Sequence, residues 1–324
     1  MNVLVTGCAG FIGMHATQAL LDSGAQVFGL DNLNDYYDVS LKNDRLQKLI
    51  THSSFKFQKV DIADLQAVKL ALGDWIPHKV LHLAAQPGVR FSIDHPHVYA
   101  QSNLVAFLNI LELCRFWKVE HLAYASSSSV YGLNSQLPFS ETDPVEQPVS
   151  LYAATKRSNE LMAYTYSHLY QLPTTGLRFF TVFGPWGRPD MAPFKFLKSM
   201  LLGERISVFN HGQQMRDFTY VDDIVKSTVA VLFKPPREKL PNAPYHVLNI
   251  GNADPVPLMD FIGTLESIVG RPAEKEFLPA QPGDVTATYA NTQALRDWIG
   301  FTPHTPLSQG LQAFADWYRE YYSA

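Results

Sequence analysis

The order of short apolar segments and longer amphipathic segments is the feature that most restricts the fold of this chain. Strands are predicted at 3–6, 26–30, 55–60, 79–83, 121–125 and 174–180. Helices are predicted between them, at 12–23, 65–72, 98–116 and 152–170. Strands that alternate with such helices build a parallel sheet with right-handed crossovers, and apolar strands indicate a sheet covered on both faces. The pattern therefore predicts an α/β fold with a doubly wound parallel sheet.

The second half of the chain has a different character. Most of the 21 prolines follow residue 183, and only short helices are predicted among them, at 194–202, 222–232, 258–269 and 307–321. Such a pattern is typical of a loop-rich lobe that closes over a ligand. We therefore expect a first domain over residues 1–180 and a smaller α/β lobe over 181–324, with some segments of the lobe returning to the first domain.

A glycine turn joins the first strand to the first helix. The segment Thr6–Gly13, TGCAGFIG, has the spacing G-x-x-G-x-x-G. Gly7 permits the tight turn, Gly10 lets the backbone approach a pyrophosphate, and Gly13 lets helix and strand pack closely. The free N–H groups at the helix start would then face the phosphates. This arrangement predicts a dinucleotide site on a Rossmann-type sheet.

An acidic residue follows the second strand at the distance expected for contact with the adenosine ribose. This residue, Asp31, would repel a 2′-phosphate, so NAD is favoured over NADP. Asp61 and Ile62 follow the third strand, where an adenine contact would lie, although a solvated loop fits Asp61 almost as well. Tyr152 and Lys156, which are described next, are predicted cofactor contacts. The other predicted cofactor contacts are Gly7, Gly10, Phe11, Ile12, Gly13, Asp31, Asn32, Asp61, Ile62, Leu83, Ala84 and Ala85.

Four serines and a Tyr-x-x-x-Lys pair form the candidate catalytic group. The serines, 126–129, follow a parallel strand at the edge where such sheets bind ligands. Tyr152 and Lys156 are one helical turn apart, about 6 Å along the axis and on the same face. A phenol that acts as a base near neutral pH needs its pKa lowered by roughly three units, and Lys156 and a nicotinamide ring are the cations that could lower it. Each motif alone is weak evidence, but together they indicate proton transfer beside a dinucleotide.

These segments resemble a known family. TGCAGFIG, YASSSSVYG, SLYAATK and QSNLVAFLNILE are similar to the extended short-chain dehydrogenases/reductases that act on nucleotide sugars, and the likeness covers essentially the whole chain. Four further segments, LDNLNDYYDVSLK, PGVRFSI, RFFTVFGPWGRPDMA and QPGDVTATYA, resemble the UDP-glucuronate 4-epimerases. The resemblance implies an NAD-dependent isomerase that interconverts UDP-glucuronate and UDP-galacturonate through a 4-keto intermediate.

The resemblance also implies roles for single residues. Tyr152 would be the base and Lys156 its partner. Ser127 and Ser128 would provide the second hydroxyl, since the register within the four serines is ambiguous, and Asn103 would be structural. In the lobe, Arg216 would contact the diphosphate and Asp284 the uridine ribose. Gln281 stands where epimerases for neutral sugars usually have arginine, which departs from their pattern.

A glucuronate substrate adds a carboxylate, whose natural partner is the planar fork of an arginine. Arg188 is the candidate, with Thr181 and the serine cluster, including Ser129, donating further hydrogen bonds. Arg90 is also expected near the nicotinamide, although a role in fixing its own loop is nearly as plausible. A ketone at carbon 4 makes the sugar prone to lose carbon dioxide, so we expect Arg188 and Thr181 to restrain the carboxylate.

Three alternative functions stay open at this stage. This chain has Ser128 and Ser129 at positions where a 4,6-dehydratase has an Asp–Glu pair and UDP-xylose synthase has a Glu. Serine cannot exchange a proton with carbon 5 as these acidic residues do, so chemistry at carbon 5 is disfavoured. A UDP-hexose 4-epimerase and a UDP-glucuronate decarboxylase are the nearest enzymatic alternatives. A non-enzymatic NAD-binding regulator would typically lack the Tyr–Lys pair that is present here.

Composition limits the partners and the location. The formal net charge of −4 provides no basic field for nucleic acid or an anionic membrane, and no apolar stretch approaches the ~20 residues of a membrane span. The start, MNVLVTG, lacks a signal-peptide pattern. Cys8 and Cys114 form neither a disulfide framework nor a zinc site, so we expect a cytoplasmic protein without a metal. By the resemblance, the helices at 98–116 and 152–170 pair two copies into a homodimer.

Overall fold

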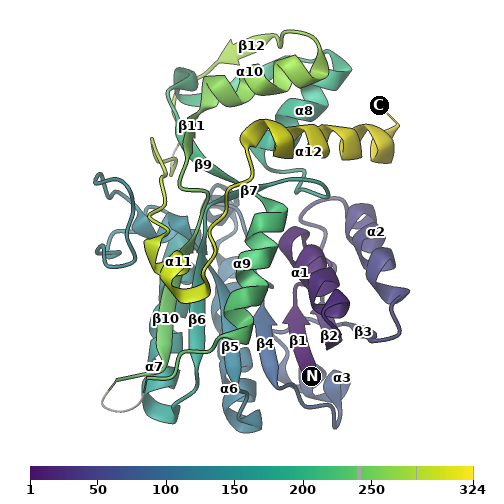
Figure 1. The fold of residues 1–324 in the computed structure, drawn as a ribbon, viewed down its shortest axis with the longest axis vertical. Helices are drawn as coiled ribbons and strands as arrows, with labels where there is room; N and C mark the ends of the chain where they lie inside the picture. Colours follow the sequence, from purple (N-terminus) through teal and green to yellow (C-terminus); the bar gives the residue numbers. More distant parts are fainter. Residues whose placement is uncertain (239–241, 282, 324) are drawn as a thin grey trace.

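A seven-stranded parallel sheet forms the centre of the computed structural model, which describes residues 1–238, 242–281 and 283–323 (Figure 1). In spatial order its strands are β10 (Tyr245–Ile250), β6 (Thr174–Phe179), β5 (His121–Ser127), β4 (Lys79–His82), β1 (Asn2–Thr6), β2 (Gln26–Asp31) and β3 (Phe55–Lys59). All six pairings are parallel. The predicted doubly wound α/β fold is confirmed.

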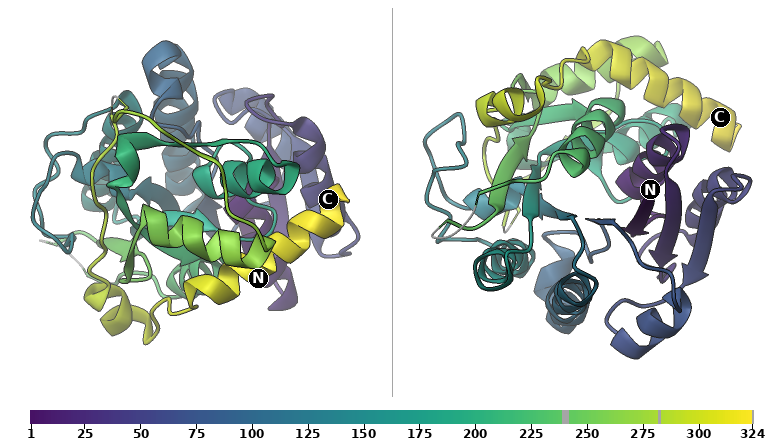
Figure 2. Two further views of the ribbon diagram at one scale, coloured as in Figure 1. Left: turned by 90° about the horizontal axis from the view of Figure 1, so that it is seen from above. Right: turned by 60° about the horizontal axis from the view of Figure 1, so that its bottom comes forward.

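Helices cover both faces of this sheet, as the right-hand view of Figure 2 shows. Side chains alternate along β1, so that Val3 and Val5 belong to the core on one face and Leu4 to the core on the other. The first core is closed by α1 (Phe11–Asp22), α2 (Val39–Ile50), α9 (Val221–Phe233) and α11 (Gln293–Ile299). The second is closed by α3 (Leu65–Leu72), α6 (Ala106–Trp117) and α7 (Leu151–Tyr170).

The remaining elements form a lobe beyond the carboxyl ends of the strands (Figure 1). It has a three-stranded sheet of β11 (Pro255–Pro257), β9 (Met215–Tyr220) and β7 (Thr181–Phe183), and a pair of β12 (Lys275–Phe277) and β8 (Ile206–Val208). Its core lies between these strands and the helices α8 (Ala192–Leu202), α10 (Leu258–Val269) and α12 (Leu307–Tyr322). The chain is not divided at one point, because α9, β10 and α11 return to the large sheet.

The helix prediction was wrong at 98–116 and left out several helices, α2 and α11 among them. The single helix predicted at 98–116 is a short α5 (Pro96–Tyr99), a π-helical segment η1 (Ala100–Val105) and α6. A π-helical turn inserts a residue and leaves the apolar periodicity almost unchanged, so the sequence pattern does not reveal it. The helix α2 was not predicted, although Asp38 caps its start by accepting a hydrogen bond from the Ser40 N–H.

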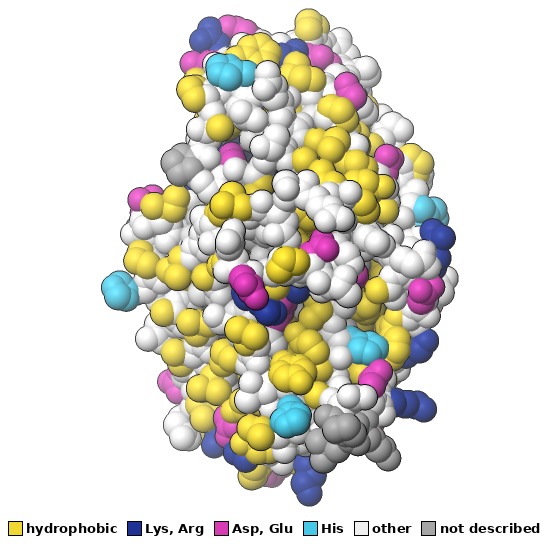
Figure 3. Space-filling model, turned by 90° about the vertical axis from the view of Figure 1, so that its left-hand side faces the viewer, with side chains coloured by type: hydrophobic (Ala, Val, Ile, Leu, Met, Phe, Trp, Pro, Cys, Tyr) yellow, Lys and Arg dark blue, Asp and Glu magenta, His cyan; other side chains and the backbone are white. Residues whose placement is uncertain are grey.

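The surface carries mixed charge on the face drawn in Figure 3, where basic, acidic and hydrophobic side chains are interspersed. Within the described part of the chain, every helix is too short or too polar to cross a membrane.

A buried ion pair fixes the helix α7 on the sheet. Glu160 of α7 accepts hydrogen bonds from Nε and Nη2 of Arg178 on β6, at 2.8 and 2.9 Å, and from the hydroxyl of Ser126 on β5, at 2.7 Å. Arg178 also donates to the Tyr131 hydroxyl, which donates to Asn249 of β10 at 2.6 Å. The carboxylate and the guanidinium are both almost fully removed from solvent. Three neighbouring strands and α7 are therefore joined by one polar network.

We expect Arg178→Met to destabilise the protein by about 3 kcal/mol or more, because it leaves the buried Glu160 carboxylate without its main partner. Arg205→Met is the matched control, since Arg205 pairs with Glu274 on the surface and such pairs contribute less than about 1 kcal/mol. Urea unfolding of both variants measures the difference. Equal losses in the two variants would contradict a central role for the buried pair.

Candidate active site

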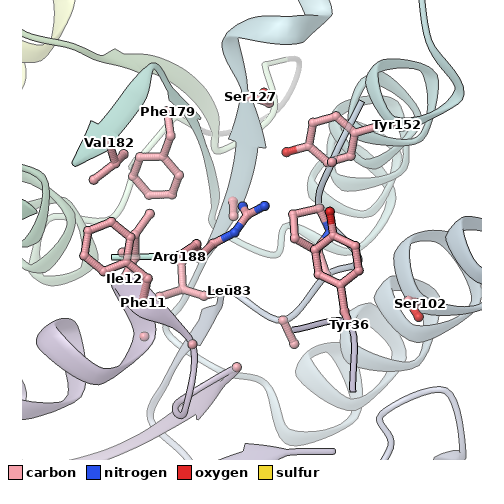
Figure 4. Close-up of a pocket in the computed structure, with 18 of the residues that line it drawn as sticks. Phe11, Ile12, Tyr36, Leu83, Ser102, Ser127, Tyr152, Phe179, Val182 and Arg188 are labelled. Carbon is pink, nitrogen blue, oxygen red and sulfur yellow. The ribbon is translucent and has the colours of Figure 1, made fainter. Parts of the chain in front are cut away.

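A cavity of about 470 Å³ lies at the carboxyl ends of the parallel strands, between the sheet and the lobe. Ligands of open α/β sheets bind at this edge. The cavity is lined by almost every site residue predicted from the sequence: Gly7, Gly10, Phe11, Ile12, Gly13, Asp31, Asn32, Asp61, Ile62, Leu83, Ala84, Ala85, Ser127, Ser128, Ser129, Tyr152, Lys156, Thr181 and Arg188. Figure 4 shows side chains from several of these elements facing one open space.

The glycine turn has the shape that a dinucleotide requires. Gly7 has a φ of +74°, and its N–H donates to the carbonyl of Leu30 at 2.7 Å. A Cβ at Gly13 would lie 1.9 Å from the Gly7 carbonyl oxygen, so only glycine allows α1 to start this close to β1. The first N–H groups of α1 are therefore exposed toward the cavity, where they can bind the pyrophosphate of a dinucleotide.

Asp31 stands at the end of β2, beside this turn. Its carboxylate accepts hydrogen bonds from the N–H groups of Ala9, at 3.1 Å, and Leu33, at 2.9 Å. Burial raises its pKa, and these N–H groups and the nearby Lys42 partly oppose the rise. Two ribose hydroxyls are suitable partners for such a carboxylate. The turn and Asp31 together fit an NAD molecule, with its pyrophosphate on α1 and its adenosine ribose at Asp31.

Tyr152 and Lys156 project from the first turns of α7 toward the end of β5. The ammonium of Lys156 donates to the Ala125 carbonyl at 2.8 Å, and burial lowers its pKa to about 8. Burial raises the pKa of Tyr152, whereas the Ser127 hydroxyl and the Arg188 guanidinium act to lower it. Lys156 stays the predicted partner of the phenol, and Arg188 is a further cation that acts to lower the pKa of Tyr152.

The structure separates the four serines by their contacts. Ser126 donates to Glu160 inside the core, whereas Ser127 lies beside Tyr152 and donates to the Ser129 hydroxyl at 3.1 Å. Ser128 and Ser129 start a short 3-10 helix, η2 (Ser128–Tyr131), and also line the cavity. The strand pleat explains this division, because successive side chains at the end of β5 point to opposite sides.

Asn103 holds the neighbouring loop in place. Its side chain accepts from the Gln86 N–H at 2.8 Å and donates to the Gln86 carbonyl and to Thr155. Asn159 of α7 in turn donates to the Asn103 carbonyl at 2.7 Å. Asn103 lies in the π-helical segment η1, and it connects that segment both to α7 and to the loop after β4.

Arg188 is oriented by an acidic neighbour. Its Nε and Nη2 donate to the two oxygens of Asp190, at 3.0 and 2.5 Å, and the Tyr36 hydroxyl donates to the same carboxylate at 3.2 Å. This pairing raises the pKa of Arg188 despite its burial. Asp190 occupies the side edge of the guanidinium, so the end edge, formed by Nη1 and Nη2, remains available. In Figure 4 the guanidinium points toward the same open space as the Tyr152 ring.

Three predicted substrate contacts do not line the cavity. Arg90 pairs with Asp284 at 3.0 Å, with its guanidinium over the ring of Phe209. Arg216 donates to the carbonyls of Val285 and Thr286, at 2.7 and 3.1 Å, and thus holds the loop that carries Asp284. The charged side chains of these loops bind groups of neighbouring loops. A motif within a single segment cannot reveal such contacts.

Among the lining residues that were not predicted individually, four have titratable side chains. Tyr36, Tyr37 and Lys42 come from the segment that leads into α2, and Asp190 follows Arg188 by two residues. Lys42 donates to the backbone and side-chain oxygens of Asn34, at 2.5 and 2.6 Å. The available signal was Asp38 as a helix cap, followed by apolar residues at helical spacing. Among the described residues, no cluster of His, Cys, Asp and Glu has a geometry that could hold a metal ion.

Comparison with known proteins agrees with this geometry. Residues 3–251 match the NAD dependent epimerase/dehydratase family, and the chain belongs to that family. The family resemblance predicted from the sequence is confirmed.

Individual relatives cover nearly the full chain. Protein CapI of Staphylococcus aureus is 52% identical over 99% of both chains. UDP-glucuronate 4-epimerase 2 of Arabidopsis thaliana is 46% identical over 99% of this chain and 76% of the relative. The crystal structure of the Bacillus cereus UDP-glucuronic acid 4-epimerase, in complex with UDP-glucuronic acid and NAD, is 37% identical and has a TM-score of 0.90, over 99% of this chain and all of the other.

We expect Lys156→Met to stabilise the nucleotide-free protein against urea at pH 7. The pKa of Lys156 is about 8 when folded and near 10.5 when unfolded, so folding disfavours its charged form below pH 8. Unfolding free energy of the parent chain should therefore rise as pH increases from about 8 to 10.5, and the variant should lack this rise. Lys79→Met, which removes a buried lysine paired with Glu120, is the control. A destabilised Lys156→Met at pH 7 would contradict the assignment.

Proposed function

We propose that this protein is an NAD-dependent 4-epimerase that interconverts UDP-glucuronate and UDP-galacturonate. The observation that carries the proposal is the meeting of three features in one cavity: the glycine turn with Asp31, the Tyr152–Lys156–Ser127 group, and the free edge of Arg188. The first fits a dinucleotide, the second a sugar hydroxyl, and the third a carboxylate. The names of the relatives agree with this combination.

In the proposed reaction, Tyr152 removes the proton from the 4-hydroxyl and later returns it. NAD, held by the glycine turn and Asp31, would supply the acceptor for the hydride from carbon 4 and the donor of the same hydride to the opposite face of the sugar. Ser127 shares the hydroxyl proton and holds the developing negative charge by its hydrogen bond. Lys156, whose ammonium donates to the Ala125 carbonyl, places positive charge at the wall of the cavity. Because burial keeps the pKa of Tyr152 high in the protein alone, the phenolate depends on positive charge from Lys156, from Arg188 and from the nicotinamide ring that NAD would supply.

The carboxylate of the sugar is proposed to bind the end edge of Arg188, with Thr181 donating beside it. Such a fixed geometry would hold the carboxyl group away from the alignment that releases carbon dioxide from the 4-keto sugar. Serines at 128 and 129 carry no carboxyl group that could exchange a proton at carbon 5. These features favour epimerisation over decarboxylation or dehydration, and glucuronate over a neutral hexose.

The remaining proposals concern the rest of the chain. We propose that residues 1–180 form the NAD-binding domain and that residues 181–324 supply the UDP-sugar lobe, with α9, β10 and α11 serving the first domain. We also propose a cytoplasmic location, which the two free, buried cysteines support.

Purified protein should convert UDP-glucuronate into UDP-galacturonate without added reductant, with no UDP-xylose in the same chromatogram. A deuterium label at carbon 4 should be retained through turnover. Tyr152→Phe should lower the rate at least about 100-fold, because it removes the acid–base group, whereas Tyr170→Phe, at the far end of the same helix, should not. Exchange of the label with solvent, or UDP-xylose as the main product, would refute the proposed reaction.

The outer faces of α6 and α7 support a homodimer. These adjacent helices expose apolar side chains, namely Leu108, Phe116, Leu161, Tyr164, Leu169 and Tyr170. Phe116 is 78% exposed, which is costly for an isolated chain in water. We expect light scattering to give twice the chain mass of 36.4 kDa, and Leu161→Glu to shift the mass toward one chain. A single-chain mass for the parent protein would refute the dimer.

A further inference from the structure

We propose that Arg45 is a positioning residue that holds the loop of Arg188 against the cofactor loop, and so sets the direction of the carboxylate-binding guanidinium. The inference rests on the proposed role of Arg188 and adds a residue that does not itself line the cavity. Arg45 comes from α2, the helix that the sequence pattern did not reveal.

The guanidinium of Arg45 connects three separate segments. Nη2 donates to the carbonyls of Trp186 and Gly187, at 2.6 and 3.1 Å, which are the two carbonyls immediately before Arg188 in the chain. Nη1 donates to the carbonyl of Ala9 in the glycine turn, at 3.3 Å, and to the hydroxyl of Tyr37, at 2.6 Å. One rigid side chain therefore fixes both the cofactor loop and the backbone that immediately precedes Arg188.

This arrangement is expensive for stability. Arg45 is fully buried and forms no ion pair with the described residues, although its charge acts at longer range on the Asp31 carboxylate. Its acceptors are three carbonyls and a phenol, and its Nε has no partner. Burying a charge without a counter-ion disfavours folding, so a purely structural purpose would be better served by an apolar side chain. The contacts of Arg45 indicate instead that it serves to hold the two loops in a fixed geometry.

The loop that Arg45 holds cannot keep its shape by local preference alone. Trp186 has a φ of +62°, which is unfavourable for a bulky residue. The turn is closed by the Gly187 N–H, which donates to the Gly184 carbonyl at 3.1 Å. His15 of α1 contacts the Pro185 carbonyl at 3.0 Å, and Trp186 packs against Trp317. Strained backbone of this kind persists only where surrounding groups enforce it.

A lysine could not replace Arg45 in this role. The two terminal nitrogens of a guanidinium are fixed in one plane and reach two carbonyls on one side and two oxygens on the other. An ammonium is a single centre and would release at least one of the loops. The Trp186–Gly187 peptide would then be free to rotate, and the end edge of Arg188 would lose its fixed direction.

A double-mutant cycle in the NAD-loaded protein tests the inference. We expect Arg45→Lys and Arg45→Met each to lower kcat/KM for UDP-glucuronate at least about 10-fold, mainly by raising KM. Because Arg45 acts through Arg188, adding Arg188→Ala to either variant should cost less than about 3-fold more, although Arg188→Ala alone costs at least about 10-fold. Affinity for UDP, which has no sugar carboxylate, should change less than about 2-fold when measured by calorimetry.

Several outcomes would overturn the inference. Effects of Arg45 and Arg188 that multiply would show that the two residues act independently. A parent-like Arg45→Lys, or an equal loss of UDP binding, would show that the fork geometry is not what matters. An unchanged Arg188→Ala would instead refute the carboxylate proposal itself, and the role of Arg45 with it. Lys79→Met, which removes a buried cation at the amino end of the central strand β4, controls for general loss of stability. Circular dichroism is used to check that each variant is folded.

Discussion

The pairing of Glu160 with Arg178 is the interaction on which the geometry of the site depends. Tyr152, Lys156 and Glu160 follow one another at intervals of four residues, so they share a face of α7. The carboxylate at the third position binds β6 and, through Ser126, the strand that also carries Ser127. The distance between the Tyr152 phenol and the Ser127 hydroxyl is therefore fixed by the buried Glu160–Arg178 pair, which does not itself line the cavity.

The charges around the cavity are kept in place at a cost to stability. Burial disfavours the charged forms of Asp31, Lys156 and Tyr152, and hydrogen bonds or neighbouring cations compensate each group only in part. A dinucleotide that brings a pyrophosphate and a positive ring would complete this arrangement. The free protein is thus organised for charges that its ligands provide, which agrees with the general finding that strongly perturbed groups cluster at functional sites.

Local patterns predicted the parts of the site that lie within one turn or one helix. The glycine turn and the Tyr–Lys pair follow from spacing along the chain, and the structure places both at the cavity. The π-helical segment was missed because one inserted residue leaves the apolar periodicity almost unchanged, and α2 was missed although its Asp38 cap and the apolar spacing after it were available as signals. Arg90, Asp284 and Arg216 stay predicted substrate contacts, and their contacts with one another were not foreseen because they depend on which loops meet after folding. The contacts of Arg45 with Trp186 and of Asp190 with Tyr36 join residues far apart in sequence, which no local pattern in a single sequence encodes.

The position of β10 at the edge of the large sheet has an evolutionary consequence. In sequence this strand lies between two groups of lobe elements, after β9 and before β11, yet it completes the sheet next to β6. Genetic recombination at one crossover point near the end of β6 could not transplant a foreign specificity lobe intact, because the chimera would also inherit a foreign seventh strand and its Asn249 contact to Tyr131. New substrate preferences in such an architecture are therefore more readily acquired by point changes in loops than by exchange of modules.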